Sequence, residues 1–568
     1  MRAVRSALLR ALCLAQVVLP PAFAQSPADW AQWGRTYDGA NHSPLTSIDS
    51  GTVARLAPVW RVSIEPGLSM PTPLVRDGVM YLHTSPDTLL ALDATSGAEL
   101  WRHVHKPEGA ASTMKMGVGL AKDRVFVPTS DLHVLALDTR TGAKIWDHAI
   151  EIRPPAEPGP TLGLRSAPLV VGNRVIQGVT TSFVAGGGFI VAMDIESGRE
   201  IWRFNTIARP GEPGGESWNG LPLEKRSGGS VWHQGTYDPE LNLIYYGVAP
   251  TYDTGPLLTP SDQQGVTRDA LYTNSTIALN PDTGKLVWSY QHMANDQWDL
   301  DWVFERQLTS LRINGETRRV VMTIGKMAIL DVLDAASGAY LFSIDTGTQN
   351  IVTKIDPKTG AKTIDLEKLP DPNRPSVYCP SPSGARSWPA TSVSQKTGMV
   401  YVPITEWCMR FGPDGYRLLS SGAGLTAADH PDAVKDGMMG RLQSLDLSGR
   451  SLGWSVDLAA PISTSTLSTS GGLVFAGDLT PSLKAFDDMT GRAVWSAPLG
   501  DYPSSSVISY AVDGRQFVAV VVGMKNNHIN DMSRRYAEFM KRQGAAVVAP
   551  SSGPAIEVFA LPTKERTP

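Results

Sequence analysis

The sequence predicts an all-β fold, an eight-bladed β-propeller made of four-stranded antiparallel blades. Three observations support this: a recurring short phrase, the spacing of its copies along the 568 residues, and a content of 53 Gly and 42 Pro residues, which is typical of a turn-rich globular protein. In its clear copies the phrase is an apolar pair, Asp or Asn, a turn ending in Gly, and an apolar run ending in Trp. Five clear and two weaker copies occupy residues 91–101, 136–146, 192–202, 278–288 and 485–495, and 332–342 and 444–454.

Each copy of the phrase predicts two strands joined by a tight turn. The first strand ends at the apolar pair, and the Gly that closes the turn is free to adopt a positive φ. The Trp in the second strand buries a large apolar surface and needs a partner for its N–H. One hairpin cannot cover its own apolar side, so the copies must stack against one another, as they do in a solenoid or a propeller.

The spacing of the copies predicts about eight blades in a closed ring. Asp93 and Asp138, in the first two turns, are 45 residues apart, and Asp194 follows 56 residues later. Longer intervals further along the chain leave room for insertions or for blades whose phrase has decayed. A string of separate β-sandwiches is the alternative, but the phrase is too regular for it and no interdomain linkers are visible. We therefore expect residues 25–568 to form one propeller domain.

The N-terminus predicts a secretory signal peptide over residues 1–24. Three arginines precede the apolar stretch 11–19, and Ala22-Phe23-Ala24 supplies the small residues of a cleavage site after Ala24. The apolar stretch is too short to span a bilayer, although a membrane anchor is the alternative interpretation. No other segment is apolar enough to span, so we expect a soluble protein exported to a bacterial periplasm. The net charge of −4 gives no indication of nucleic acid as a partner.

The chain contains three cysteines, and Cys13 leaves with the signal peptide. The remaining pair, Cys379 and Cys408, predicts a disulfide in an oxidising compartment. Two buried thiols or a metal pair are the alternatives, but neither cysteine has His or Cys neighbours at ligand spacing. No Cys-x-x-Cys-His motif is present, so the sequence predicts no covalently attached haem.

Three polar clusters lie outside the repeated phrase. Asp299 and Asp301 are two residues apart, so on an extended segment their carboxylates share one space, where they either bind a hard cation or raise one pKa. Trp232 follows a Gly-Gly pair and is a candidate platform for a planar ligand. Lys326 lies between a Gly and an apolar run, which is compatible with an inward position. The alternatives are turn-capping aspartates, a core Trp and a solvated Lys, respectively.

These clusters, in this order and with the blade phrase, resemble the pyrroloquinoline quinone (PQQ)-dependent alcohol dehydrogenases from about residue 30 to residue 562. The family motif Trp-Asp-x-Asp reads Trp298 to Asp301 here. A second element, Gly-Gly-x-x-Trp followed by Tyr-Asp-Pro, reads Gly228 to Pro239. The resemblance implies an eight-bladed propeller with the quinone in its axial funnel.

The resemblance also assigns roles to single residues. Trp232 is expected to stack under the quinone, beside the hydroxyls of Ser230 and Thr180. Asp299 matches the catalytic general base, and Lys326 matches the cation beside the quinone carbonyls. Further assignments are Arg165 to a PQQ carboxylate, Lys115 as the substitute for a cofactor-binding Arg, Asp301 as an additional metal-binding carboxylate, and Cys379–Cys408 as a structural disulfide.

Two expected metal ligands are missing from the chain. The family's Glu falls near residues 181–183, where no acid occurs, and its Asn falls at Pro250. A calcium ion, or a lanthanide, would then be held by Asp299, Asp301, quinone oxygens and a backbone carbonyl.

The resemblance implies a periplasmic enzyme that oxidises an alcohol to the carbonyl compound, with PQQ as hydride acceptor. An aromatic residue that narrows the pocket in some members is missing after Pro250, which indicates a bulky or secondary alcohol. Because the chain predicts no haem of its own, a soluble cytochrome c is the expected electron acceptor. The alternatives are a non-catalytic propeller that binds other proteins and a PQQ-dependent sugar dehydrogenase.

Overall fold

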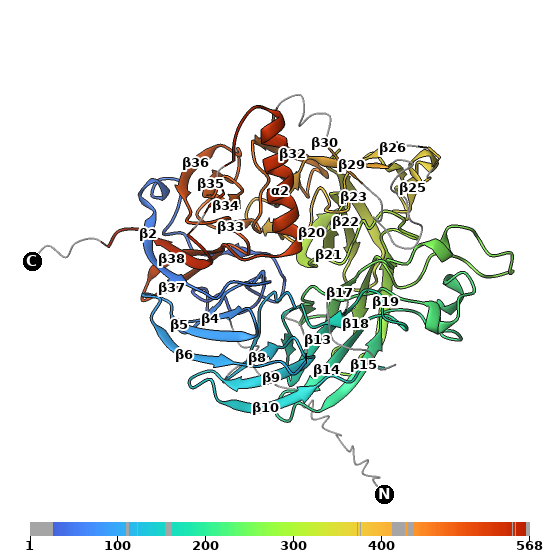
Figure 1. Ribbon diagram of the computed structural model, residues 1–568, viewed down its shortest axis with the longest axis horizontal. Helices are drawn as coiled ribbons and strands as arrows, with labels where there is room; N and C mark the ends of the chain where they lie inside the picture. The colour runs from blue at the N-terminus through green and yellow to red at the C-terminus, as the bar shows by residue number, and fades with distance from the viewer. Residues whose placement is uncertain are drawn as a thin grey trace, which may run out of the picture.

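A computed structural model confirms the predicted eight-bladed propeller (Figure 1). The structure describes residues 26–109, 113–121, 123–153, 162–371, 373–374, 376–411, 426–429, 437–547, 549–550 and 552–563. The predicted signal peptide, residues 1–24, lies outside this range. In the described part of the chain, no helix combines the length and the apolar character needed to cross a membrane.

Blades 1 to 4 follow one another along the chain, and each is an antiparallel four-stranded sheet. Their strands are β3 (Leu74–Arg76), β4 (Val79–Thr84), β5 (Thr88–Asp93) and β6 (Glu99–Val104); β7 (Gly119–Leu120), β8 (Arg124–Pro128), β9 (His133–Asp138) and β10 (Lys144–Ala149); β12 (Leu169–Val171), β13 (Arg174–Thr181), β14 (Phe189–Asp194) and β15 (Glu200–Asn205), with β11 (Leu162–Gly163) added at the end of β13; and β16 (Thr236–Asp238), β17 (Leu243–Val248), β18 (Ser275–Leu279) and β19 (Leu286–Gln291).

Blades 5 to 8 repeat the pattern, but the last one joins both ends of the chain. Their strands are β20 (Gln307–Ile313), β21 (Glu316–Ile324), β22 (Ile329–Asp334) and β23 (Tyr340–Asp345); β27 (Ser392–Ser394), β28 (Met399–Thr405), β31 (Gly440–Asp446) and β32 (Ser451–Leu458); β33 (Leu467–Thr469), β34 (Leu473–Asp478), β35 (Ser482–Asp487) and β36 (Ala493–Pro498), with β1 (His42–Ser43) parallel to β33; and β37 (Ile508–Val512), β38 (Arg515–Val522), β39 (Ala555–Ala560) and β2 (Ala57–Ser63). The early strand β2 pairs with the late strand β39, which closes the ring (Figure 1).

Three insertions decorate the ring. The hairpin β24 (Val352–Ile355) and β25 (Lys362–Ile364) follows blade 5, and β26 (Ser376–Tyr378), β29 (Trp407–Phe411) and β30 (Thr426–Asp429) form a small sheet. Helix α2 (Asn527–Arg542) lies between β38 and β39 and packs Met532, Tyr536 and Phe539 into an apolar cluster. The described residues also form five 3-10 turns: Val53–Arg55, Gly215–Ser217, Leu223–Lys225, Gly255–Leu257 and Leu366–Lys368.

The repeated phrase joins neighbouring blades. The indole N–H of Trp202 donates to the Pro281 carbonyl of the next blade at 2.8 Å. A Cβ on Gly284, which has a φ of 68°, would lie 2.5 Å from the Trp202 ring, so only Gly allows the ring to pack on this turn. Trp101, Trp146, Trp288, Trp454 and Trp495 dock on the following blade in the same way.

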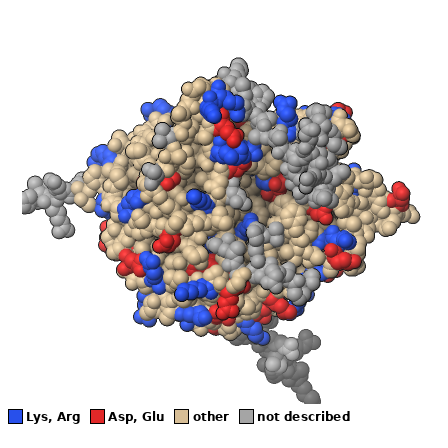
Figure 2. All heavy atoms as spheres, viewed as in Figure 1, with Lys and Arg blue, Asp and Glu red and all other residues tan. Residues whose placement is uncertain are grey.

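In blade 1 the first strand is largely buried and the fourth is partly exposed, and the fourth strands β6, β10 and β15 lie at the outer edge of the ring (Figure 1), so the first strands face the central axis. The loops before these first strands therefore meet at the axis. On the face shown in Figure 2, acidic and basic side chains are interspersed, in agreement with the small net charge.

Candidate active site

Backbone hydrogen bonds join the axial loops of neighbouring blades. Met70 N–H donates to the carbonyl of Lys115 at 2.8 Å, and Met116 N–H donates to the carbonyl of Arg165 at 3.0 Å. Val231 N–H donates to the carbonyl of Val179 at 3.0 Å. The predicted site residues Lys115, Arg165 and Thr180 thus lie on segments that backbone hydrogen bonds connect to their neighbours around the axis.

The structure brings Lys326, Asp299 and Asp301 into direct contact. Nζ of Lys326 lies 2.7 Å from Oδ2 of Asp301 and 3.2 Å from Oδ1 of Asp299. It also donates to the Asp299 carbonyl at 2.8 Å. The Lys326 side chain is 8% exposed and Asp301 is 5% exposed, whereas Asp299 is 21% exposed. Asp299 is therefore the carboxylate that a small molecule can reach.

Asp296 shapes the loop that carries both carboxylates. Its side chain accepts the N–H groups of Trp298 at 2.8 Å and Leu300 at 2.6 Å. Asn274 donates to the same carboxylate and accepts the N–H of Trp302. Because these bonds fix the loop, Asp299 is held at a φ of 63°, a left-handed conformation that non-Gly residues seldom adopt.

Burial and mutual repulsion set the charge state of this cluster. Burial raises the pKa of Asp299 well above its usual value, although the Lys326 ammonium acts in the opposite direction, and Asp301 and Asp296 raise it further. The pKa of Asp301 is also raised by burial, against the effect of Lys326. Burial opposes the charge on Lys326, but the two carboxylates outweigh it and raise the pKa of Lys326. The cluster therefore combines a permanent cation with a carboxylate of increased basicity.

Trp232 forms an aromatic floor next to this cluster. Its ring stacks on Trp388, with centroids 3.8 Å apart, and meets the edge of Phe304 at 5.3 Å. Tyr252 connects the floor to the carboxylates, because its phenol forms side-chain hydrogen bonds with both Trp232 and Asp301. Tyr252 thus links Trp232 to one of the two carboxylates that Lys326 contacts.

The Gly-Gly pair before Trp232 serves the packing of the chain itself. Gly228 has a φ of 90°, and a Cβ there would lie 2.5 Å from the Cα of Thr251. Gly229 has a φ of 63°, and a Cβ there would lie 2.9 Å from the Ile207 side chain. Both positions need Gly because neighbouring segments approach closely, which is sufficient reason for the pair without a ligand.

The small hydroxyl residues are buried beside the floor. Oγ of Ser230 accepts the N–H of Thr181 at 2.9 Å. Oγ1 of Thr180 has no hydrogen-bond partner among the described residues. Arg165 lies close enough to Tyr252 for their charges to interact, and burial lowers the pKa of its guanidinium.

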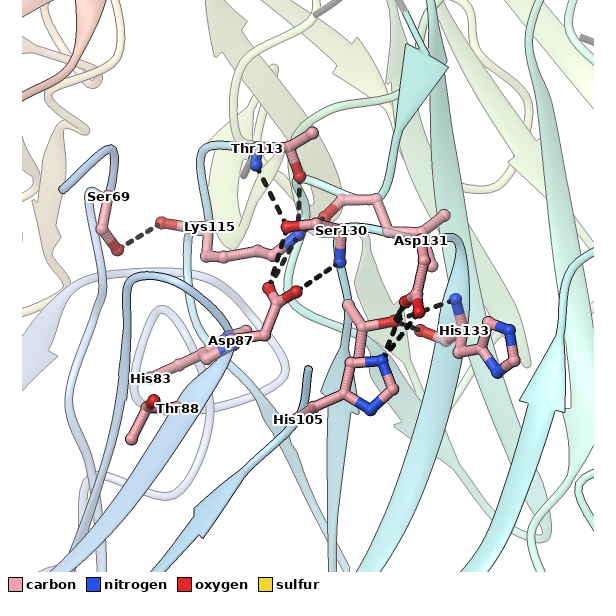
Figure 3. Close-up of polar contacts among 12 residues, drawn as sticks. Ser69, His83, Asp87, Thr88, His105, Thr113, Lys115, Ser130, Asp131 and His133 are labelled. Carbon is pink, nitrogen blue, oxygen red and sulfur yellow. Dashed lines mark hydrogen bonds and ion pairs between the residues drawn. The ribbon is translucent and has the colours of Figure 1, made fainter. Parts of the chain in front are cut away.

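Lys115 is fully buried between blades 1 and 2 (Figure 3). Its ammonium donates to Oγ1 of Thr113 at 2.6 Å and lies 3.4 Å from Oδ1 of Asp87. Ser130 binds the same carboxylate through its N–H and its hydroxyl. Burial lowers the pKa of Lys115 to about 8, although Asp87 acts against this. Because its charge is already paired within the protein, a role for Lys115 in cofactor binding stays a prediction.

Cys379 and Cys408 form the predicted disulfide. The bond joins β29 to the residue that follows β26, in the small sheet that packs on the active-site loop. Tyr378 and Met409, the neighbours of the two cysteines, share an apolar cluster with Trp298 and Trp302. The disulfide thus cross-links the small sheet that packs against Trp298 and Trp302, the residues on either side of Asp299 and Asp301.

Sequence reasoning missed three residues of the site. Tyr252 and Trp388 lie outside every repeated phrase, and their contacts depend on how blades 4 and 6 meet at the axis. Asp296 could have been found from the sequence, because an Asp in a loop often accepts the backbone N–H of the residue two positions later.

The chain is similar in sequence to known proteins. Residues 30–352 and 435–518 match the family model described as PQQ glucose/ethanol/alcohol dehydrogenase, β-propeller domain. The chain is 32% identical to the quinohemoprotein alcohol dehydrogenase ADH IIB of Pseudomonas putida, over 88% of this chain and 74% of the relative.

Solved structures show the same architecture. The quinohemoprotein alcohol dehydrogenase ADHIIG of Pseudomonas putida HK5 superimposes with a TM-score of 0.80 at 27% identity, over 95% of this chain and 82% of that one. A europium-containing methanol dehydrogenase superimposes with a TM-score of 0.82 at 24% identity, over 94% of this chain and 98% of that one, which shows the common fold.

Proposed function

Because this chain belongs to the family of PQQ-dependent alcohol dehydrogenases, we propose that it oxidises an alcohol between Trp232 and the Lys326–Asp299–Asp301 cluster. The relatives are dehydrogenases rather than protein-binding scaffolds, which favours the enzyme over the scaffold alternative. The observation that carries the proposal is the ammonium of Lys326, which holds the partly exposed carboxylate of Asp299.

The residues present fit a planar, anionic quinone with three carboxylates. Trp232 has a planar ring that is 3% exposed and stacks on Trp388, and Ser230 and Thr180 have buried hydroxyls. Within the described residues, Oγ1 of Thr180 is buried without a hydrogen-bond partner, so a ligand acceptor would satisfy it. Arg165 supplies a positive charge for an anionic ligand.

The quinone, when bound, supplies the two-electron redox chemistry that no side chain provides. Asp299 accepts the hydroxyl proton of the alcohol on its carboxylate, whose raised pKa makes it a better base than a free Asp. Lys326 orients this carboxylate through Oδ1 and the backbone carbonyl and keeps a positive charge in the site. Asp296 holds the loop, so that Asp299 needs no rearrangement before it acts.

The finer parts of the proposal concern substrate and surroundings. We propose a bulky or secondary alcohol as substrate, because Phe183 and Tyr252 pack together at 5.9 Å and Phe183 is 52% exposed, which leaves an apolar surface next to the site. The N-terminal sequence supports a periplasmic location. A separate soluble cytochrome c is the proposed electron acceptor.

The Asp299→Asn variant tests the proposal. After reconstitution with PQQ, the wild type should oxidise alcohols with an artificial dye as acceptor, and the variant should lose about 100- to 10,000-fold in kcat. Asp262→Asn, at an exposed position, is the matched control and should behave as wild type. Equal rates for wild type and Asp299→Asn would remove Asp299 as the base. No oxidation by the reconstituted wild type on any of a panel of alcohols and sugars would overturn the proposed function.

A further inference from the structure

The Lys326 ammonium is bound as a metal ion would be. An ammonium has three N–H groups, and three oxygens lie within 3.2 Å of Nζ: the Asp299 carbonyl, Oδ1 of Asp299 and Oδ2 of Asp301. The two carboxylates that the sequence offers as metal ligands therefore converge on a cation that the chain itself provides.

The two positions where the family carries its other metal ligands hold no acid: residues 181–183 read Thr-Ser-Phe, and residue 250 is Pro. Thr181 uses its N–H on Ser230 and its hydroxyl on the Gly228 carbonyl. The Phe183 ring packs on Tyr252, whose phenol is hydrogen-bonded to Asp301. The Pro250 carbonyl accepts the N–H of Gly229 at 3.3 Å.

This donor set does not fit a hard cation. Calcium takes six to eight oxygen ligands, usually with several carboxylates among them. Within the described part of the chain, no three His, Cys, Asp or Glu side chains form a group that could hold a metal ion.

We propose that the Lys326 ammonium replaces the metal ion in this protein, which binds its quinone and oxidises alcohols without calcium or a lanthanide. The inference rests on the proposed quinone site, and it concerns which cation completes that site. It differs from the expectation of a calcium or lanthanide ion held by Asp299 and Asp301, because both carboxylates already share a cation.

Quinone binding tests the inference without relying on activity. The full-length protein, stripped of cofactor, is titrated with PQQ in EDTA, in calcium and in lanthanum, and quenching of Trp fluorescence is followed. The Kd should agree within threefold in the three buffers, and mass spectrometry should find fewer than about 0.1 metal ions per bound PQQ. Binding that requires calcium or lanthanum, or one metal ion per quinone, would overturn the inference but leave the proposed function intact. No binding in any buffer would overturn the proposed function and the inference with it.

Variants of Lys326 identify the cation. Lys326→Gln leaves two carboxylates without an ammonium, so in EDTA it should bind PQQ at least tenfold more weakly, and calcium or lanthanum should restore part of the affinity. Lys326→Arg keeps the charge and should bind in EDTA within about threefold of wild type. Lys285→Gln, at an exposed turn, is the matched control. Unchanged binding of Lys326→Gln in EDTA would contradict the proposal, and circular dichroism of each variant separates weak binding from unfolding.

Discussion

Replacing Lys326 with Met should destabilise the protein, and the loss should depend on pH. The side chain is 8% exposed and neutralises two carboxylates, one of them 5% exposed. Removing one partner of a buried ion pair costs about 3–5 kcal/mol, because the remaining charge is left without compensation. We therefore expect a loss of about 3–5 kcal/mol in the free energy of unfolding at pH 8.

The loss should shrink at lower pH. Without the ammonium, Asp299 and Asp301 bind protons more tightly in the folded than in the unfolded protein, so the free energy of unfolding falls as pH rises. At lower pH the folded variant takes up protons at these carboxyls, which reduces the uncompensated charge. The variant should thus be closest to wild type at pH 5 and furthest from it at pH 8.

Urea unfolding at both pH values measures this difference. Adding Asp301→Asn to Lys326→Met removes one of the two stranded carboxylates and should recover about half of the loss at pH 8. Lys285→Met, in an exposed turn, should change stability by less than about 0.5 kcal/mol. A loss below about 1 kcal/mol, or the same loss at both pH values, would refute the description of a buried cation shared by two carboxylates.

Three further predictions concern the ring, the disulfide and the base. Gly284→Ala should lower the free energy of unfolding by about 2–4 kcal/mol in a urea or thermal melt, because its Cβ would meet the Trp202 ring. The control Gly514→Ala, with a similar φ of 76° and no described atom within 4 Å of the Cβ position, should cost only about 1 kcal/mol. Equal losses would contradict blade docking through this turn. Replacing Cys379 and Cys408 with Ser removes the disulfide between residues 29 positions apart and should lower the free energy of unfolding by about 3–4 kcal/mol. A stability equal to that of the oxidised wild type would show that the bond contributes nothing. Since only ionised Asp299 accepts a proton and its pKa is raised, kcat/KM should increase with pH and level off above that pKa, and a flat profile would exclude this base.

The fold could be predicted from the sequence because each repeat carries, within about ten residues, the pattern that specifies its own hairpin. Each turn from Asp to Gly specifies a hairpin, and the Trp that follows specifies how the next blade docks, as Trp202 and Gly284 show. Closure of the ring by β2 and β39 was not predictable from the phrase, since it joins segments about 500 residues apart.

The candidate site was predictable only in part. Asp299 and Asp301 are two residues apart, so the proximity of their carboxylates follows from strand geometry. Their contact with Lys326 could be expected only from the resemblance to known enzymes. The pairing of Lys115 with Asp87 and the stacking of Trp388 on Trp232 join different blades. Such contacts depend on the closed ring and leave no pattern in the local sequence.

A crystal structure of the protein grown with PQQ and EDTA tests the central claim most directly. The account predicts flat density in contact with the Trp232 indole, next to the Asp299 carboxylate, with the Lys326 ammonium as the cation between the two carboxylates. Density for the quinone away from Trp232, or a metal ion between Asp299 and Asp301, would contradict it.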